Sequence, residues 1–147
     1  MNSSLVYLVQ TDTTVGFSSS NHEKLSDIKQ RPRSKKILHT VDSFKTLKKH
    51  TRIPKKFRKE IRRASLTTYI YPNLKSFRVI KKENSFYDFI HKFGILYSTS
   101  ANKTAQSFEY NFAKEHSDIM LINKNNFYES SASRIIKITK TLKKAIR

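Results

Sequence analysis

Leu5-Val6-Tyr7-Leu8-Val9 is an apolar run that passes directly into the polar stretch Gln10-Thr11-Asp12-Thr13-Thr14. Its short length and its Val and Tyr content predict a buried strand. The same pattern returns at Ile95-Leu96-Tyr97, which leads into Ser98-Thr99-Ser100-Ala101-Asn102. In α/β sheets, ligands bind beyond the carboxyl ends of the strands. The two polar stretches are therefore the first candidates for a binding site.

Strand-like and helix-like segments alternate along the rest of the chain. Strands are expected at residues 5–9, 36–41, 66–71, 76–80, 95–97, 119–122 and 133–138. Helices are expected at residues 20–30, 43–50, 54–63, 86–93 and 106–116, followed by a helical tail. Capping boxes begin at Ser20 and Ser85, and Gly94 follows the fourth helix at a C-cap position. This alternation predicts one α/β domain over residues 1–147, with a twisted mixed sheet flanked by helices.

The positive charge of the chain is concentrated in two segments. Residues 29–63 hold fifteen Lys and Arg against two acids, and residues 134–147 hold six Lys and Arg and no acid. Charge gathered in this way attracts polyanions, and binding that neutralises phosphates is sensitive to salt. The alternative is a solvated surface in a host whose proteins are rich in Lys. That alternative accounts for the total positive charge better than for its concentration in two segments.

Composition also argues against several kinds of site. The chain has no Cys, and its five His residues show no metal-ligand spacing, so we expect neither a disulfide nor a metal site built by the protein. No apolar run approaches the roughly 20 residues that span a bilayer, and the N-terminus does not have the pattern of a secretory signal. We expect a cytoplasmic protein without membrane contact.

Lys29 and Arg31 are candidates for binding phosphate, because Arg makes bidentate phosphate contacts and Lys supplies a point charge. They lie two residues apart at the end of a predicted helix, and Pro32 fixes the chain after them. The alternative is that they are two of fifteen bases in a solvated run.

Ser98, Ser100 and Asn102 alternate along the chain and share one side if the backbone stays extended. Three neutral hydrogen-bonding groups after an apolar strand suit a phosphate or an amino-acid carboxylate. A polar turn is the alternative, since Ser and Asn are common turn residues.

In this order, Lys29-Gln30-Arg31-Pro32 and Ser98-Thr99-Ser100-Ala101-Asn102 resemble the YrdC/TsaC family, the threonylcarbamoyl-AMP synthases. The signature of that family joins a Lys-x-Arg half to a Ser-x-Asn half. Thr11-Asp12-Thr13-Thr14-Val15-Gly16 is similar to the family's opening motif, with Gln10 in place of its Pro and Val15 in place of its aromatic residue. The resemblance implies a YrdC-like (RibB-like) α/β fold with a central concave cavity.

The resemblance also implies a set of binding residues. Those for ATP are Lys29, Arg31, Thr67, Ser100, Asn102 and Ser133, and those for L-threonine are Thr13, Arg78 and Ser98. The chain departs from the family at four places: no helix precedes the first strand, no Gly-Pro precedes Thr67, Ala105-Gln106-Ser107 replaces a Gly-x-Pro, and Lys137 replaces an Asp. It therefore resembles a shortened and diverged member.

The implied activity is that of a nucleotidyltransferase. It would make L-threonylcarbamoyladenylate and pyrophosphate from L-threonine, bicarbonate and ATP, with Mg²⁺ carried by the ATP, no bound metal and no catalytic nucleophile. The product serves threonylcarbamoyladenosine modification of tRNA, so transfer proteins of the TsaD/TsaB/TsaE type and tRNA are expected partners.

Two other functions remain open. One is a non-catalytic YrdC-like module that binds double-stranded RNA or tRNA through Lys55, Lys56, Arg58 and Lys59. In that hypothesis Tyr69, Tyr71 and Phe77 could stack on bases, although core packing is expected of at least two of them. The other is a small ribosome-associated basic protein, which would leave the threonine and phosphate motifs unexplained.

Overall fold

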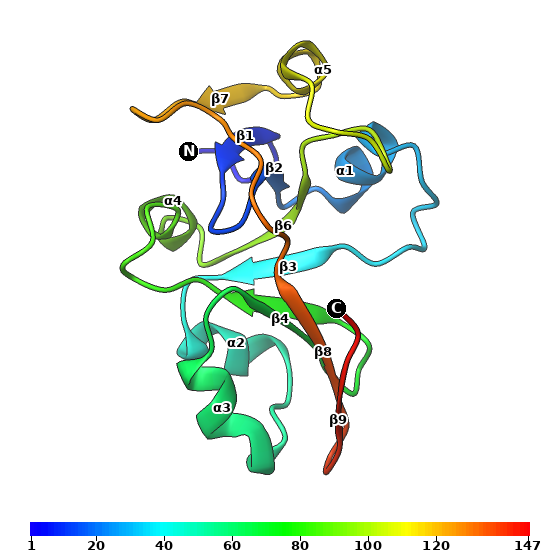
Figure 1. The fold of residues 1–147 in the computed structure, drawn as a ribbon, viewed down its shortest axis with the longest axis vertical. Coiled ribbons are helices and arrows are strands. Elements are labelled where there is room, and N and C mark those ends of the chain that lie inside the picture. The colour runs from blue at the N-terminus through cyan, green and yellow to red at the C-terminus, as the bar shows by residue number, and fades with distance from the viewer. The chain divides into compact units, whose positions relative to one another are not determined.

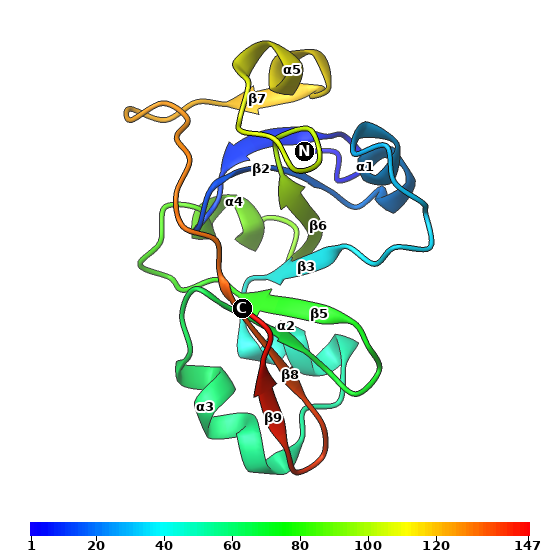
Figure 2. The same cartoon turned by 45° about the vertical axis from the view of Figure 1, so that its right-hand side comes forward.

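A computed structural model describes all 147 residues, with nine strands, five α-helices and one 3₁₀ helix. The chain forms two compact units (Figures 1 and 2). Unit 1 consists of Met1–Ile37 and Leu96–Ala132, and unit 2 consists of Leu38–Ile95 and Ser133–Arg147. Both contain parallel and antiparallel strand pairs together with helices, which confirms the predicted α/β class with mixed strand pairing.

The strands of unit 1 lie in the order β7-β1-β2-β6. Their bounds are Tyr7–Gln10 for β1, Val15–Ser19 for β2, Ile95–Ser100 for β6 and Ile119–Leu121 for β7. β1 runs parallel to β7 and antiparallel to β2, which in turn pairs antiparallel with β6. The sequence did not predict β2, and it ended the strand at Tyr97, whereas β6 continues through Ser98 to Ser100.

The helices of unit 1 are α1, His22–Ile28, and α5, Tyr110–Glu115. Asn21 caps α1, because its Oδ1 accepts a hydrogen bond of 3.0 Å from the backbone N–H of Lys24, so the predicted cap at Ser20 was one residue early. α1 packs on β2. Apolar residues from the strands and both helices form the buried core of this unit: Val6, Leu8, Val15, Phe17, Leu25, Ile37, Ala101, Phe112 and Ala113.

The strands of unit 2 lie in the order β3-β5-β4-β8-β9. Their bounds are Leu38–Val41 for β3, Thr67–Ile70 for β4, Ser76–Val79 for β5, Arg134–Ile138 for β8 and Lys143–Ala145 for β9. β3 pairs parallel with β5, and β4 pairs parallel with β8. The helical elements are α2, Phe44–His50, the 3₁₀ helix η1, Lys55–Phe57, α3, Arg58–Arg63, and α4, Tyr87–His91.

The core of unit 2 gathers under α2 and α3, with α2 packed on β3 and β5. Tyr69, Tyr71 and Phe77 are all buried in this core, and the Tyr71 and Phe77 rings meet edge to face at 5.7 Å. Rings at this depth cannot reach a base, so the suggestion that they stack on RNA was wrong.

The tail after β8 forms a strand, so the predicted helix there was wrong. A turn at 139–142 reverses the chain: the backbone N–H of Thr139 donates to the carbonyl of Leu142 at 2.9 Å, and that of Leu142 donates to Thr139 Oγ1 at 3.1 Å. β9 then pairs antiparallel with β8. Its backbone hydrogen bonds outweigh the helix propensity of its Lys and Ala residues.

The C-cap of α4 is Lys92, two residues before the predicted position at Gly94. Gly94 does have the left-handed backbone of a helix-terminating glycine, with a φ of 78°, and its N–H donates to the carbonyl of Ile90 at 2.8 Å. The predicted capping box at Ser85 was wrong, because Asn84 Oδ1 accepts from the N–H of Phe86 and the helix has no side-chain cap. None of the helices combines the length and apolar character needed to cross a lipid bilayer.

Candidate functional site

Lys29 joins the two sequence motifs within unit 1. It is the C-cap of α1, and its side chain is only 5% exposed. Its ammonium donates to the Ser100 carbonyl at 3.0 Å, to Asn102 Oδ1 at 2.8 Å and to the Asn102 carbonyl. The fold therefore brings the Lys-x-Arg half and the Ser-x-Asn half, 71 residues apart at Lys29 and Ser100, into direct contact.

The segment after β6 is folded around Lys29. Ser100 Oγ donates to Asn102 Oδ1 at 2.6 Å, and the Asn102 amide donates to the Gln106 carbonyl. Thr104 Oγ1 returns a hydrogen bond of 3.0 Å to the Lys29 carbonyl. With its three donors directed at protein oxygens, the Lys29 ammonium fixes the positions of the Ser100 hydroxyl and the Asn102 amide.

Arg31 lies beside Lys29 and keeps donors available. Its Nη2 donates to Thr99 Oγ1 at 3.1 Å, whereas its buried Nε–H has no hydrogen-bond partner. Burial lowers the pKa of Arg31, and burial together with the charge of Arg31 lowers the pKa of Lys29 to about 8. Two neighbouring cations with lowered pKa values and an unused donor favour a bound anion, which would offset their repulsion.

The polar stretch after β1 is a turn organised by Thr11. Its Oγ1 accepts from the N–H groups of Thr13 and Thr14 at 3.2 Å and donates to the Thr14 carbonyl at 2.6 Å. Thr13 is buried within this turn, 3.3 Å from Thr11 through its hydroxyl. Ser98 is also buried, in β6 opposite Ser18 of β2.

A cavity of about 270 Å³ opens between this turn and the segment after β6. Its lining residues are Thr14, Val15, Ser100, Ala101, Asn102, Phe108, Glu129 and Ser130. The Glu129 carboxylate accepts from the Phe108 N–H and so fixes one wall. Sequence reasoning missed Phe108 and Glu129, because neither belongs to a motif: Phe108 follows the Ala105-Gln106-Ser107 segment that departs from the family, and Glu129 is far from the motifs in the chain.

Three of the residues predicted to bind ATP or L-threonine, Thr67, Arg78 and Ser133, lie in unit 2, where a second polar cluster is centred on Thr68. Thr68 Oγ1 lies 2.9 Å from Ser133 Oγ and accepts from Arg78 Nη1 at 3.4 Å. Arg78 is only 4% exposed. Arg78 and Ser133 are thus linked by a residue that the sequence analysis did not select.

Thr67, which was selected, has other contacts. Its Oγ1 donates to the Ser65 carbonyl at 2.8 Å and accepts from Arg134 at 3.5 Å. Successive side chains of a strand point to opposite faces, so Thr67 and Thr68 of β4 cannot both join Arg78. The alternation of β4 indicates that only one of the two adjacent threonines can join Arg78, and the register of β4 decides which one.

The four bases predicted to contact RNA, Lys55, Lys56, Arg58 and Lys59, are exposed on η1 and the first turn of α3. Nowhere in the structure do three His, Asp or Glu side chains gather in a way that could hold a metal ion.

No family model and no curated protein matches this sequence. Solved structures do match it. MTH1692 from Methanobacterium thermoautotrophicum is 15% identical with a TM-score of 0.70, over 98% of this chain and 80% of that one. Sua5 from P. abyssi, complexed with L-threonine, is 14% identical with a TM-score of 0.75, over 98% of this chain and 50% of that one. YciO from E. coli is 13% identical with a TM-score of 0.75, over 98% of this chain and 82% of that one.

These similarities confirm the predicted YrdC-like fold, which Sua5 and YciO share. The chain spans about half the length of Sua5.

Proposed function

We propose that this chain is a nucleotidyltransferase of the YrdC/Sua5 type, which makes L-threonylcarbamoyladenylate and pyrophosphate from L-threonine, bicarbonate and ATP. The observation that carries the proposal is the direct contact of Lys29 with Ser100 and Asn102, beside an Arg31 that has an unused buried donor. Two proteins of similar fold add support: Sua5 was solved with L-threonine, and HypF in a phosphate- and nucleotide-bound form (12% identical, TM-score 0.72).

In this proposal Arg31 and Lys29 have different roles. The amine of L-threonine first combines with bicarbonate, with loss of water, to give an N-carboxylate. An oxygen of that N-carboxylate attacks the α-phosphorus of ATP, and the bond from that phosphorus to pyrophosphate breaks. Negative charge grows on the leaving pyrophosphate, and the guanidinium of Arg31 stabilises it through donors that no protein group uses. Lys29 adds positive charge nearby and holds the Ser100 hydroxyl and the Asn102 amide in place. Mg²⁺ enters with the ATP.

We assign the carboxylate of L-threonine to Arg78. A buried guanidinium binds a carboxylate strongly, and Thr68 fixes one of its nitrogens at 3.4 Å. Transfer proteins would consume the adenylate and carry the threonylcarbamoyl group to tRNA.

Pyrophosphate release by the purified protein tests this function. We expect release that requires ATP, L-threonine and bicarbonate together, and a fall of at least about 100-fold in Arg31→Gln, the scale of losing one donor to developing charge. Arg33→Gln is the matched control, because Arg33 is an exposed Arg two residues away that pairs with Glu23 and Asp27.

Release that persists without L-threonine, or that is equal in the two variants, would contradict the proposal. If folded protein releases no pyrophosphate and still binds RNA, a non-catalytic RNA-binding module becomes the better assignment.

A further inference from the structure

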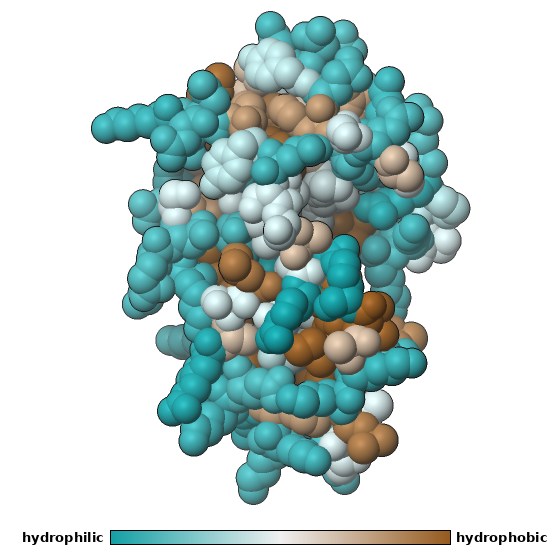
Figure 3. All heavy atoms as spheres, in the orientation of Figure 1, coloured by the Kyte–Doolittle hydropathy of each residue, from teal (hydrophilic) through white to brown (hydrophobic).

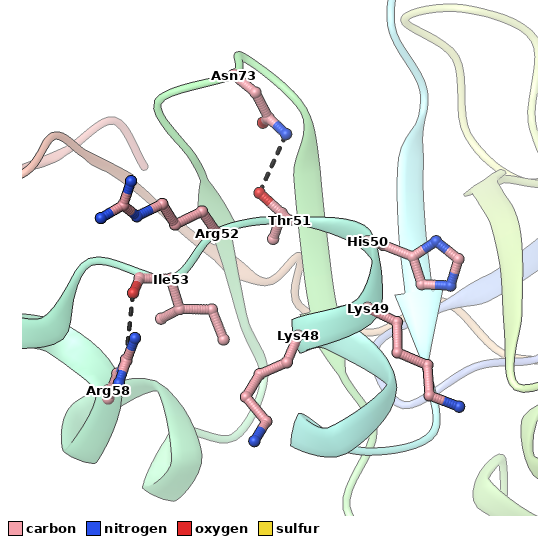
Figure 4. A pocket seen from close by; sticks show the side chains of 8 residues that line it. All are labelled: Lys48, Lys49, His50, Thr51, Arg52, Ile53, Arg58 and Asn73. Carbon is pink, nitrogen blue, oxygen red and sulfur yellow. Dashed lines mark hydrogen bonds between the residues drawn. The ribbon is translucent and has the colours of Figure 1, made fainter.

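Unit 2 carries a hollow lined by positive charge where α2 leads into η1. The cavity measures about 540 Å³ and is lined by Lys48, Lys49, His50, Thr51, Arg52, Ile53, Arg58 and Asn73 (Figure 4). Lys48, Lys49 and His50 extend from the last turn of α2, and Arg52 extends from the opposite side of the loop. Arg58 enters from the first turn of α3.

A second cavity of about 900 Å³ continues the first and shares five lining residues with it: Thr51, Arg52, Ile53, Arg58 and Asn73. It reaches Lys140 and Thr141 at the turn between β8 and β9. Seven Lys and Arg residues line the two cavities, and no Asp or Glu lines either. We call these seven the cationic track: Lys48, Lys49, Arg52, Lys55, Lys56, Arg58 and Lys140.

The charge of the cationic track is uncompensated. None of its members pairs with a carboxylate, whereas Lys143 on the adjacent strand β9 pairs with Glu60 at 2.9 Å. The polar contacts that its members do make are to carbonyl oxygens, from Lys56 to Thr141 at 2.9 Å and from Arg58 to Ile53 at 3.3 Å. The C-terminus of α2 contributes only about half a negative charge. Like charges gathered in this way repel, and a bound polyanion would relieve that repulsion.

The base of the cationic track is fixed although its charged groups are exposed. Thr51, Ile53, Pro54 and Phe57 are buried, and Asn73 Nδ2 donates to Thr51 Oγ1 at 3.0 Å. This hydrogen bond ties the loop to the turn between β4 and β5, as Figure 4 shows. Hydrophilic side chains also dominate the face over α3 in Figure 3. The backbone is therefore preorganised, and a ligand would need to order only the side-chain ends.

We propose that the cationic track binds the sugar–phosphate backbone of a nucleic acid. Two joined cavities exceed what one phosphate needs, and several cations in succession suit a chain of phosphates. No Phe, Tyr or Trp side chain lines either cavity, and His50 is the one aromatic ring there. The contacts are therefore made mainly to the sugar–phosphate backbone and carry little sequence preference. The cations line hollows, which a flat anionic bilayer would reach less well than a flexible or helical backbone would.

This inference refines the RNA-binding residues expected from the sequence. Lys55, Lys56 and Arg58 line the track, whereas Lys59 lines neither cavity. The track also includes Lys48 and Lys49 at the end of α2, together with Arg52 and Lys140. The inference does not depend on synthase activity, although the proposed function makes RNA the expected nucleic acid.

The test compares two variants that lose the same charge. Lys49→Gln/Arg52→Gln/Lys55→Gln removes three track cations that make no hydrogen bond or ion pair in the structure, so the fold should survive. Lys82→Gln/Lys92→Gln/Lys114→Gln removes three exposed cations outside the track and is the matched control. Binding of a fluorescent RNA hairpin is measured by anisotropy between 50 and 200 mM salt, and thermal unfolding checks that both variants are folded.

We expect the track variant to bind the hairpin at least about tenfold more weakly than the control, with a slope of log affinity against log salt smaller by about 2 to 3. A DNA duplex of the same sequence should show the same difference. An equal loss in both variants would overturn the proposal, because binding would then follow net charge alone. A track variant that loses only its binding to phosphatidylserine vesicles would also overturn it, in favour of a lipid surface.

Discussion

Replacing Lys29 with Met should change how the stability of the protein depends on pH, with little change at pH 7. Met keeps an unbranched apolar side chain of similar length and removes the ammonium. At pH 7 two effects oppose each other. The carbonyls of Ser100 and Asn102 lose a donor, which costs about 2–4 kcal/mol in all. Removing a buried charge gains back about 3 kcal/mol, from a pKa lowered from 10.5 to about 8.

The pH dependence isolates the second effect. The pKa of Lys29 in the folded protein lies below its value of 10.5 in the unfolded chain, so between pH 8 and 10.5 the unfolded chain binds more protons. The stability contributed by Lys29 therefore rises with pH across this window. Between pH 7 and pH 9.5 the native protein should gain about 2 kcal/mol relative to Lys29→Met.

Urea unfolding of both proteins at pH 7 and pH 9.5, followed by circular dichroism, measures this gain. Other groups titrate in the same range, but they are common to both proteins and cancel in the difference. If the free-energy difference between native protein and variant stays constant to within about 0.5 kcal/mol, Lys29 is not the buried, charge-repelled ammonium that its contacts indicate.

Two further predictions concern groups outside the Lys29 contacts. Gly16→Ala should destabilise the protein by about 1–3 kcal/mol in urea unfolding, because a Cβ at Gly16 would lie 2.9 Å from the backbone oxygen of Thr99; an unchanged midpoint would contradict this close approach of β2 to β6. Asp42→Asn should lower the melting temperature at pH 6 more than at pH 3. Burial raises the pKa of Asp42, but hydrogen bonds from three side chains, His91 among them, leave it below 3.8, so the stability that this carboxylate contributes is present above that pH and lost as the pH falls through the folded value. Equal decreases in melting temperature at the two pH values would show that the charge of the Asp42 carboxylate does not contribute to stability.

Elements with a strong local signal were predictable from the sequence. The run at Leu5–Val9 predicted β1, and the spacing of apolar residues before Gly94 predicted α4, because in both cases the residues that define the element are neighbours in the chain. β2 was missed for the opposite reason. Gly16 and two serines are poor strand formers, and this strand exists because β1 and β6 pair with it on both sides.

The site was predictable to the level of motifs but not of atoms. The resemblance of the Lys-x-Arg and Ser-x-Asn motifs to the family signature implied that the two halves meet, and Lys29 does contact Ser100 and Asn102. The choice between Thr67 and Thr68 depended on the register of β4, which a shift of one residue inverts. Two of the four oxygens within hydrogen-bond distance of the Lys29 ammonium belong to the backbone, and their positions follow from the turn after β6, which no side-chain pattern encodes.

The contacts of Lys29 and Arg31 also decide which of the two cations can touch an anion directly. An ammonium has three N–H donors, and those of Lys29 are directed at oxygens of Ser100 and Asn102. A guanidinium has five donors, and the buried Nε–H of Arg31 has no partner. The Nε–H is buried, and the one hydrogen bond of the guanidinium runs from Nη2 to Thr99. A phosphate that reaches the outer nitrogens of Arg31 adds hydrogen bonds there, whereas contact with Lys29 would displace a protein oxygen. Arg31→Lys keeps the positive charge but removes the fork of guanidinium donors. It should therefore weaken anion binding although the charge is unchanged.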